Sequence, residues 1–216
     1  MTRGKILILL AMTACATALS VAPASAFFKA SSGKYPVTIT VSKNEPQKFK
    51  IGTSVELECS TIAVEGRLLG EGSQLTVRPT YSGCSGIITG TKVSTVKVKT
   101  NECLYNFHQA KGEKVGSVSV ECPGSNFIFI ETNVLECDIK IFSSPNLKEV
   151  TFENEGSGTT EEVKVEPKVS GIAFESAKCA GIIPVKGNNA TYEGISLVLG
   201  LISNNGVSER TGILVV

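Results

Sequence analysis

Few side chains in this chain of 216 residues could carry acid–base, nucleophilic or metal chemistry. It has one histidine, His108, and one aspartate, Asp138. A Ser-His-Asp triad would have to use that histidine, sites with several histidine ligands are impossible, and calcium loops built on spaced aspartates are absent. No nucleophile motif flanks His108, which favours an exposed strand histidine. The sequence therefore indicates no catalytic residue, no metal ligand and no cofactor.

Paired glutamates are the remaining candidates for catalysis. Glu56 and Glu58 share one face of an expected strand, and Glu161 and Glu162 are adjacent. Two carboxylates about 5–10 Å apart can hydrolyse a glycosidic bond. Glu56 and Glu58 alternate with apolar residues, however, as solvated strand faces do, and the chain has no tryptophan to stack on a sugar. A secreted hydrolase that uses glutamates is therefore the alternative to a role without catalysis.

Two short strips of lysine are the only clusters of positive charge that stand out. Lys97 and Lys99 form one strip, and Lys48 and Lys50 form the other. Lysine often protects the edge of a sheet from pairing with another chain, so we expect these strands to lie at edges. The net charge of +1 gives no electrostatic footprint for nucleic acid or for an anionic membrane.

Residues 1–26 have the pattern of a secretory signal peptide. Arg3 and Lys5 precede a mostly apolar stretch, residues 6–22, and Ala24-Ser25-Ala26 matches a cleavage site, so the mature chain would begin at Phe27. Two alternatives are a retained membrane anchor and lipidation at Cys15. No later stretch is long and apolar enough to span a bilayer. The pattern predicts a secreted or cell-surface protein with no transmembrane segment after cleavage.

Six cysteines remain once this leader is removed. An even number in an exported chain indicates three disulfides. No two of the six are close enough for a zinc site or for a C-x-x-C redox pair. Fifteen pairings are possible, and we favour the one that joins neighbours along the chain: Cys59 with Cys84, Cys103 with Cys122, and Cys137 with Cys179.

Apolar residues alternate with polar ones along most of the chain. Val37, Ile39 and Val41 show this period of two, and no segment after the leader shows sustained helical periodicity. The pattern predicts an all-β, antiparallel, sandwich-like fold of packed sheets stapled by three disulfides, with about ten to twelve strands. We expect a single domain over residues 27–216, with a possible boundary near 143–146.

Two hairpins can be given a register from the sequence. In the first, residues whose numbers sum to 225 would face each other around a turn at 111–114, which places Cys103 opposite Cys122. In the second, Val150 would face Val165 around the glycines at 156–158. Between the hairpins, residues 127–130 are apolar on both faces, which favours a central strand covered on both sides. We expect the apolar last four residues to be buried.

Several of these motifs together resemble a group of bacterial secreted six-cysteine β-proteins with no assigned activity. The resemblance covers most of the mature chain and rests on Tyr81-Ser82-Gly83-Cys84, Cys103-x-Tyr105, Cys122-Pro123-Gly124, Cys137-x-Ile139-x-Ile141, Cys179 and Tyr192-Glu193-Gly194. It implies export and disulfides, and it supplies no catalytic residue.

The expected function is binding or support outside the cytoplasm, without catalysis. The partner would be a cell-surface protein or a glycan, and not nucleic acid. Binding faces commonly lie on loops, and residues 66–72 and 186–194 are the loops we expect to carry one. A hydrolase that uses glutamates and an inhibitor of a secreted enzyme are the alternatives.

Overall fold

A computed structural model describes residues 28–109, 114–132, 137–179, 186–204 and 206–216. The expected leader, residues 1–26, and Cys15 lie outside the described residues. Within them the regular structure is strand, apart from one 3-10 turn, η1 (Gly158–Thr160), and no helix is long and apolar enough to cross a membrane. All pairings between strands are antiparallel, and the three expected disulfides are present. The predicted all-β fold is confirmed.

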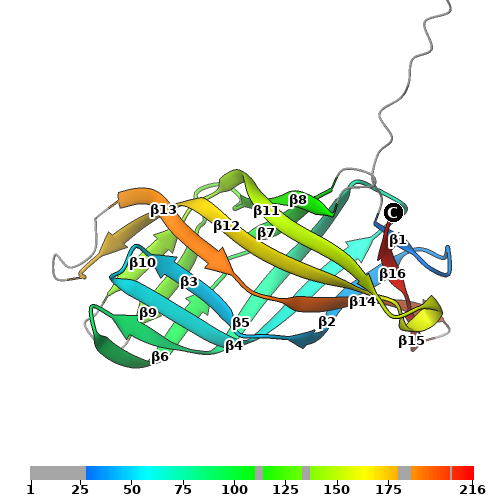
Figure 1. Ribbon diagram of the computed structural model, residues 1–216, viewed down its shortest axis with the longest axis horizontal. Coiled ribbons are helices and arrows are strands. Elements are labelled where there is room, and N and C mark those ends of the chain that lie inside the picture. The colour runs from blue at the N-terminus through cyan, green and yellow to red at the C-terminus, as the bar shows by residue number, and fades with distance from the viewer. Residues whose placement is uncertain (1–27, 110–113, 133–136, 180–185, 205) are drawn as a thin grey trace, which may run out of the picture.

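Three long strands run the length of the elongated molecule: β4 (Val55–Leu68), β5 (Gln74–Ile88) and β12 (Glu162–Ala177) (Figure 1). Five more long strands each consist of two shorter ones that follow each other along the chain. These pairs are β2 (Val37–Asn44) with β3 (Gln47–Ile51), β6 (Thr91–Lys99) with β7 (Leu104–His108), β8 (Val115–Glu121) with β9 (Ile128–Thr132), β10 (Asp138–Ile141) with β11 (Ser144–Glu155), and β13 (Lys186–Glu193) with β14 (Ser196–Asn204). Because each of these five interruptions divides one long strand into two, the described residues contain 16 strands rather than the expected ten to twelve.

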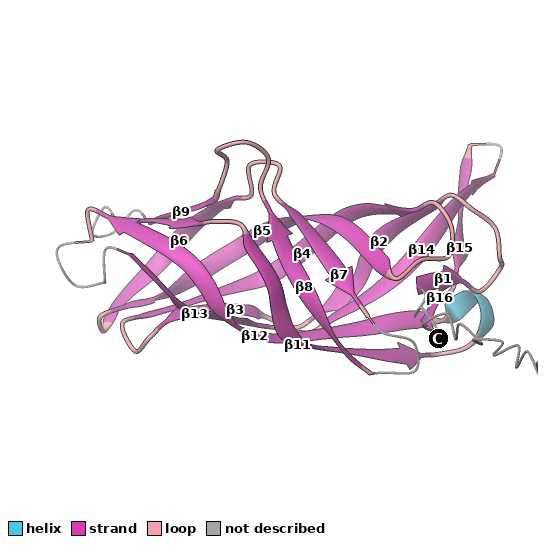
Figure 2. Cartoon of the chain, turned by 90° about the horizontal axis from the view of Figure 1, so that it is seen from above, coloured by secondary structure: helices cyan, strands magenta, loops and turns pink. Residues whose placement is uncertain are grey.

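The eight long strands form a closed sheet. Each one pairs with the next along the chain, and the last pairs with the first, because β13 is bonded to β3 and β14 to β2. β6, β9, β10 and β13 lie toward one end, called here the β9 half, and β2, β14 and β15 (Val207–Thr211) toward the other, the β14 half (Figures 1 and 2). Closure leaves an interior just wide enough for side chains or for one small ligand.

A small second sheet closes the β14 half. In it, β1 (Phe28–Ala30) pairs with β16 (Ile213–Val215). Phe28 is fully buried and packs edge-on against Phe152, with 5.5 Å between ring centroids. The Asn154 side chain bonds both the N–H and the C=O of Val215, each at 2.8 Å. The expected burial of the C-terminus is confirmed for Ile213 and Val215, whereas Val216 is exposed.

Every long strand is kinked or interrupted at about the same level, around the middle of the molecule. We call this level the belt; it comprises residues 44–47, 59–61, 82–84, 100–103, 122–127, 142–144, 170–172 and 194–195. At the belt the parity of the inward residues changes: Leu57 and Cys59 point inward before it, and Ile62 after it. Gly83 (φ +61°) and Gly171 (φ +85°) adopt the left-handed backbone that these kinks require.

Side chains satisfy the backbone groups that the belt leaves out of the ladders. Asn44 Nδ2 donates to the Ser60 carbonyl at 2.9 Å, and Asn101 Nδ2 donates to the Phe127 carbonyl at the same distance. Ser143 Oγ accepts the Cys122 N–H at 3.0 Å. These three hydrogen bonds lie at the surface, and each connects two neighbouring long strands at the belt.

The disulfides and the first hairpin agree with the sequence-based expectation. Cys59–Cys84, Cys103–Cys122 and Cys137–Cys179 join cysteines with Cα–Cα distances of 3.9, 4.1 and 4.4 Å. The register between β7 and β8 has the expected sum of 225, with Tyr105 opposite Val120. Residues 111–113 of the expected turn lie outside the described residues. The Cα–Cα distances of the three disulfides are similar to the distance of about 4.5 Å that is typical of the closer, non-hydrogen-bonded type of cross-strand pair.

Other expectations were wrong in detail. Val150 faces Pro167 rather than Val165, so the second hairpin is shifted by two residues, because its connection contains η1. Residues 186–193 form β13 and not a loop, and Gly66 lies within β4. The strips Lys48/Lys50 and Lys97/Lys99 are not at edges, because β3 pairs with β4 and β13, and β6 pairs with β5 and β9.

Candidate functional site

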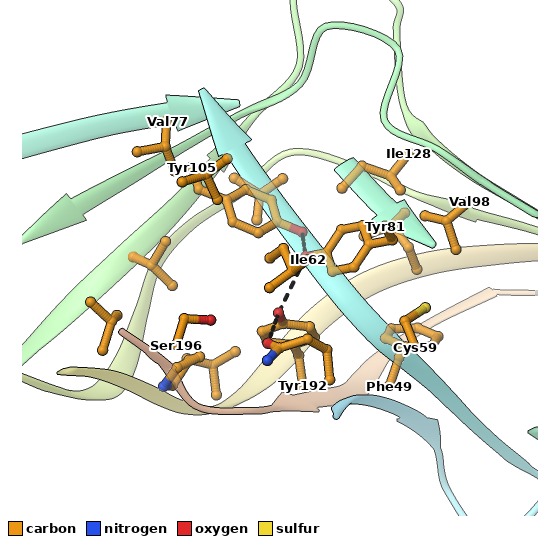
Figure 3. Close-up of a pocket in the computed structure, with 18 of the residues that line it drawn as sticks. Phe49, Cys59, Ile62, Val77, Tyr81, Val98, Tyr105, Ile128, Tyr192 and Ser196 are labelled. Carbon is orange, nitrogen blue, oxygen red and sulfur yellow. Dashed lines mark hydrogen bonds between the residues drawn. The ribbon is translucent and has the colours of Figure 1, made fainter. Parts of the chain in front are cut away.

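A cavity of about 110 Å³ lies inside the closed sheet at the belt, where the two halves meet (Figure 3). The lining includes Val98 of β6 and Ile130 of β9 from the β9 half, Val198 of β14 from the β14 half, and Val120 of β8 and Ile62 of β4. These side chains meet here because the belt changes which residues of each strand point inward. The lining is almost entirely apolar.

The main polar group in the lining is a chain of hydroxyl groups from three tyrosines on different strands, and Ser196 adds one further hydroxyl. Tyr81 (β5) and Tyr105 (β7) place their hydroxyl oxygens 2.9 Å apart, and the Tyr81 hydroxyl lies 3.3 Å from that of Tyr192 (β13). Tyr192 donates to Gln47 Oε1 at 2.5 Å. Figure 3 shows the tyrosines pointing toward one another among the apolar lining residues.

Strand alternation aims each tyrosine inward. Tyr81 has the same parity as Leu75 and Val77, which are buried on β5. Tyr105 lies directly opposite Val120, and Tyr192 lies opposite Phe49. The three tyrosines lie inside the closed sheet but are only partly covered by neighbouring atoms, since each borders the cavity.

Burial keeps the tyrosine hydroxyls protonated. It raises the pKa of Tyr105 to about 12. Burial also raises the pKa of Tyr81 and of Tyr192 well above the ordinary value. Both neighbouring tyrosines add to the shift of Tyr81, whereas for Tyr192 the charge of Tyr105 adds to the shift and the hydrogen bond with Tyr81 opposes it. At neutral pH the chain is therefore uncharged, and each hydroxyl has a single proton to donate.

A second group of aromatic side chains lies on the outer face of the β9 half. Phe127 is 6.1 Å, between ring centroids, from both Phe129 and Phe142. The Lys140 ammonium lies 4.9 Å from the Phe127 ring centroid, and that of Lys99 lies 5.6 Å from the Phe129 centroid. As expected, β9 is a central strand, but Phe129 on its outer face is only half-buried.

The glutamates considered for catalysis do not line the cavity. Glu56 and Glu58 lie on the outer face of β4, paired with Lys50 at 3.5 Å and Lys48 at 3.8 Å. Each of these ion pairs joins opposed residues of β3 and β4.

The other two glutamates contact residues near the capped end. Glu161 accepts a hydrogen bond from Ser31 at 2.6 Å, and Glu162 pairs with Arg210 at 2.5 Å. His108 has the opposite parity to cavity-lining Phe107 and so faces outward. Within the described ranges, no three His, Cys, Asp or Glu side chains gather to hold a metal ion.

Sequence reasoning missed the tyrosine chain. In the sequence, Tyr81, Tyr105 and Tyr192 stand out only as parts of the motifs that carry the resemblance, and those motifs are structural. A tyrosine with the inward parity of its strand is a usable signal, because a buried phenol needs a hydrogen-bond partner. The partner itself follows only from closure of the sheet.

Comparisons of this chain with models of protein families, with curated proteins and with solved structures find no match. The function is therefore argued from the site itself.

Proposed function

We propose that this chain is an exported binding protein without catalytic activity, and that it holds one small, mainly apolar molecule in the belt cavity. The observation that carries the proposal is the cavity of about 110 Å³ on which three tyrosines from three different strands converge. Ligand sites are typically apolar concavities with a few polar groups that fix orientation, and this cavity has that composition.

Export is supported by the disulfides. All six cysteines after the leader pattern are paired, and such bonds persist mainly in oxidising compartments outside the cytoplasm. The N-terminal pattern at residues 1–26 favours the same location. We therefore place the protein as secreted or held at the cell surface.

The size of the cavity sets the size of the ligand. An apolar cavity of about 150 Å³ in another protein holds benzene, so this cavity of about 110 Å³ suits a molecule no larger than one aromatic ring with a small substituent. Small ligands gain at most about 1.5 kcal/mol per non-hydrogen atom, and ordinary ones gain less, so we expect dissociation constants between about 10 µM and 1 mM.

Titration of isotope-labelled protein with toluene, followed by NMR, tests the proposal. Saturable shifts confined to residues around the belt, such as Ile130 and Val198, support it. Val120→Phe should abolish the shifts, because Val120 lines the cavity, whereas Val115→Phe places the same ring on the exposed side of β8 and should leave them unchanged. Ser196→Leu is a second filling variant if the first does not fold. Absence of saturable binding would overturn the proposal.

The outer aromatic group supports a second candidate, contact with a cell-surface protein or a glycan. Three aromatic rings lie beside two lysines on the outer face of the sheet: those of Phe127, Phe129 and Phe142. Aromatic and cationic side chains are favoured at binding surfaces. Loss of cell-surface retention in Phe127→Ser, with retention kept in Val207→Ser at an exposed site elsewhere, would favour this candidate.

A further inference from the structure

The direction of the hydrogen bonds in the tyrosine chain is fixed at one end by Gln47. Its Nε2 group donates to two backbone carbonyls, that of Glu45 at 2.7 Å and that of Ile195 at 3.1 Å. Gln47 is buried, and its Oε1 atom therefore faces Tyr192 as an acceptor. Because Oε1 has no proton, the Tyr192 hydroxyl must donate its only proton to the hydrogen bond with Gln47.

The same reasoning passes along the chain. Tyr192 has no proton left for Tyr81, so the Tyr81 hydroxyl donates to Tyr192. Tyr81 then has no proton left for Tyr105, so the Tyr105 hydroxyl donates to Tyr81 across 2.9 Å. The chain therefore runs from Tyr105 through Tyr81 and Tyr192 to Gln47, and every hydroxyl proton is in use.

The Tyr105 oxygen is the open end of this chain. Its proton is committed to Tyr81, and its lone pairs receive no hydrogen bond from any donor among the described residues. Tyr105 lines the cavity (Figure 3). The tyrosine end of the cavity can therefore accept a hydrogen bond, but it has no proton left to give. The other hydroxyl group that lines the cavity belongs to Ser196.

Building on the proposed function, we infer that the ligand of the belt cavity is an uncharged molecule with an apolar body and one hydrogen-bond donor, such as a phenol or a small alcohol, whose O–H bonds to the Tyr105 oxygen. A ligand that can only accept, such as an aldehyde or ketone, meets no free proton at the tyrosine chain. A carboxylate or an ammonium ion would in addition lose its hydration inside an apolar wall. The chain thus selects ligands by the direction of one hydrogen bond.

Three probes of similar size separate the possibilities: toluene, which is apolar; phenol, which can donate; and benzaldehyde, which can only accept. All three are uncharged at about pH 7, since phenols ionise near pH 10. The comparison is made in Ser196→Ala, which removes the cavity hydroxyl outside the tyrosine chain. In this variant we expect phenol to bind at least about 5-fold more tightly than benzaldehyde, the ratio that one net hydrogen bond supplies.

The double variant Tyr81→Phe/Tyr105→Phe removes both oxygens that phenol could reach at the open end. We expect the ratio of phenol affinity to toluene affinity to fall at least about 5-fold in this variant, because toluene binding does not depend on these oxygens. Tyr35→Phe is the matched control, because Tyr35 does not line the cavity and its hydroxyl instead contacts the Ala30 N–H. It should leave the ratio unchanged.

The outcomes distinguish the inference from the proposed function. If none of the three probes binds, the proposed function itself fails. If toluene binds but phenol is not preferred to benzaldehyde, the cavity is a binding site and the donor inference is wrong. If the double variant folds and keeps the wild-type ratio of phenol to toluene affinity, the inference also falls. If it does not fold, the ratio of phenol to benzaldehyde affinity in Ser196→Ala still decides.

Discussion

The direction of the tyrosine chain predicts an unusual pattern of stability changes. Tyr105→Phe removes the first donor and leaves no O–H group without an acceptor, so we expect it to lower the free energy of unfolding by about 0.5–1.5 kcal/mol. Tyr81→Phe removes two hydrogen bonds and leaves the Tyr105 O–H, which lies inside the closed sheet, with no acceptor. Its cost should therefore be larger, about 2–3 kcal/mol.

The double variant Tyr81→Phe/Tyr105→Phe tests the order of the chain most sharply, because the effect of Tyr105→Phe on stability should change sign. In the Tyr81→Phe background the Tyr105 hydroxyl is only an unsatisfied donor, so removing it should leave stability unchanged or raise it. The same substitution in the wild-type background should lower stability. This reversal of sign follows from the order of the chain and is a coupling that a double-mutant cycle measures directly.

Urea unfolding followed by far-ultraviolet circular dichroism, with the disulfides intact, provides the assay, because the signal does not depend on the tyrosines that are removed. An unchanged dependence of the unfolding free energy on urea shows that the variants unfold from the same fold. The reasoning is refuted if Tyr105→Phe costs as much as Tyr81→Phe, or if Tyr105→Phe destabilises the Tyr81→Phe background.

Three further predictions follow from other parts of the structure. In an alkaline titration followed by phenolate absorbance, three of the four tyrosines should remain mostly protonated at about pH 11 in the folded protein, and all four should be ionised in denaturant. Because the pKa of Tyr105 is raised to about 12 on folding, the stability it contributes is complete below about pH 10 and is lost as the pH rises toward about 12; three phenols that ionise near pH 10 in the folded state would contradict this. Reduction of the disulfides, which close loops with sequence separations of 19, 25 and 42, should remove about 3–4 kcal/mol per bond and lower the melting temperature by many degrees; an unchanged melting curve after verified reduction is the opposing result. Gly86→Ala should cost about 1–3 kcal/mol, because its Cβ would press on the Glu56 carbonyl and, at 2.9 Å, on Leu57 Cα, whereas Gly70→Ala meets nothing within 4 Å and should change stability little; equal urea midpoints for the two variants would show that the close approach of β4 and β5 is wrong.

The sequence was sufficient for features that depend on neighbouring strands. Alternation and directly opposed cysteines set the register of β7 and β8, because a slip of one residue would turn Tyr105 and Phe107 outward. The second hairpin shows the limit of this reasoning. A shift of two residues keeps Val150 and Phe152 on the same face, so alternation cannot distinguish the sum of 315 from the observed 317.

Closure of the sheet and the cavity could not be predicted in the same way. Closure depends on pairing between β2 and β14, whose residues lie more than a hundred positions apart, and nothing in either strand alone specifies the other as its partner. Alternation shows which residues point inward, but not what they meet there. Nothing in the sequence marks Gly83 and Gly171 as sites of kinks, and only the structure shows that they lie at the belt with the other strand breaks.

The central claim is that the belt cavity is a real binding space inside the closed sheet. A crystal of the protein exposed to xenon under pressure tests it most directly, since xenon enters apolar cavities of this size. We expect one strong xenon peak within the belt, bordered by Ile62, Ile130 and Val198 and next to the tyrosine chain. A cavity filled by side chains, with no xenon peak at the belt, would contradict the account.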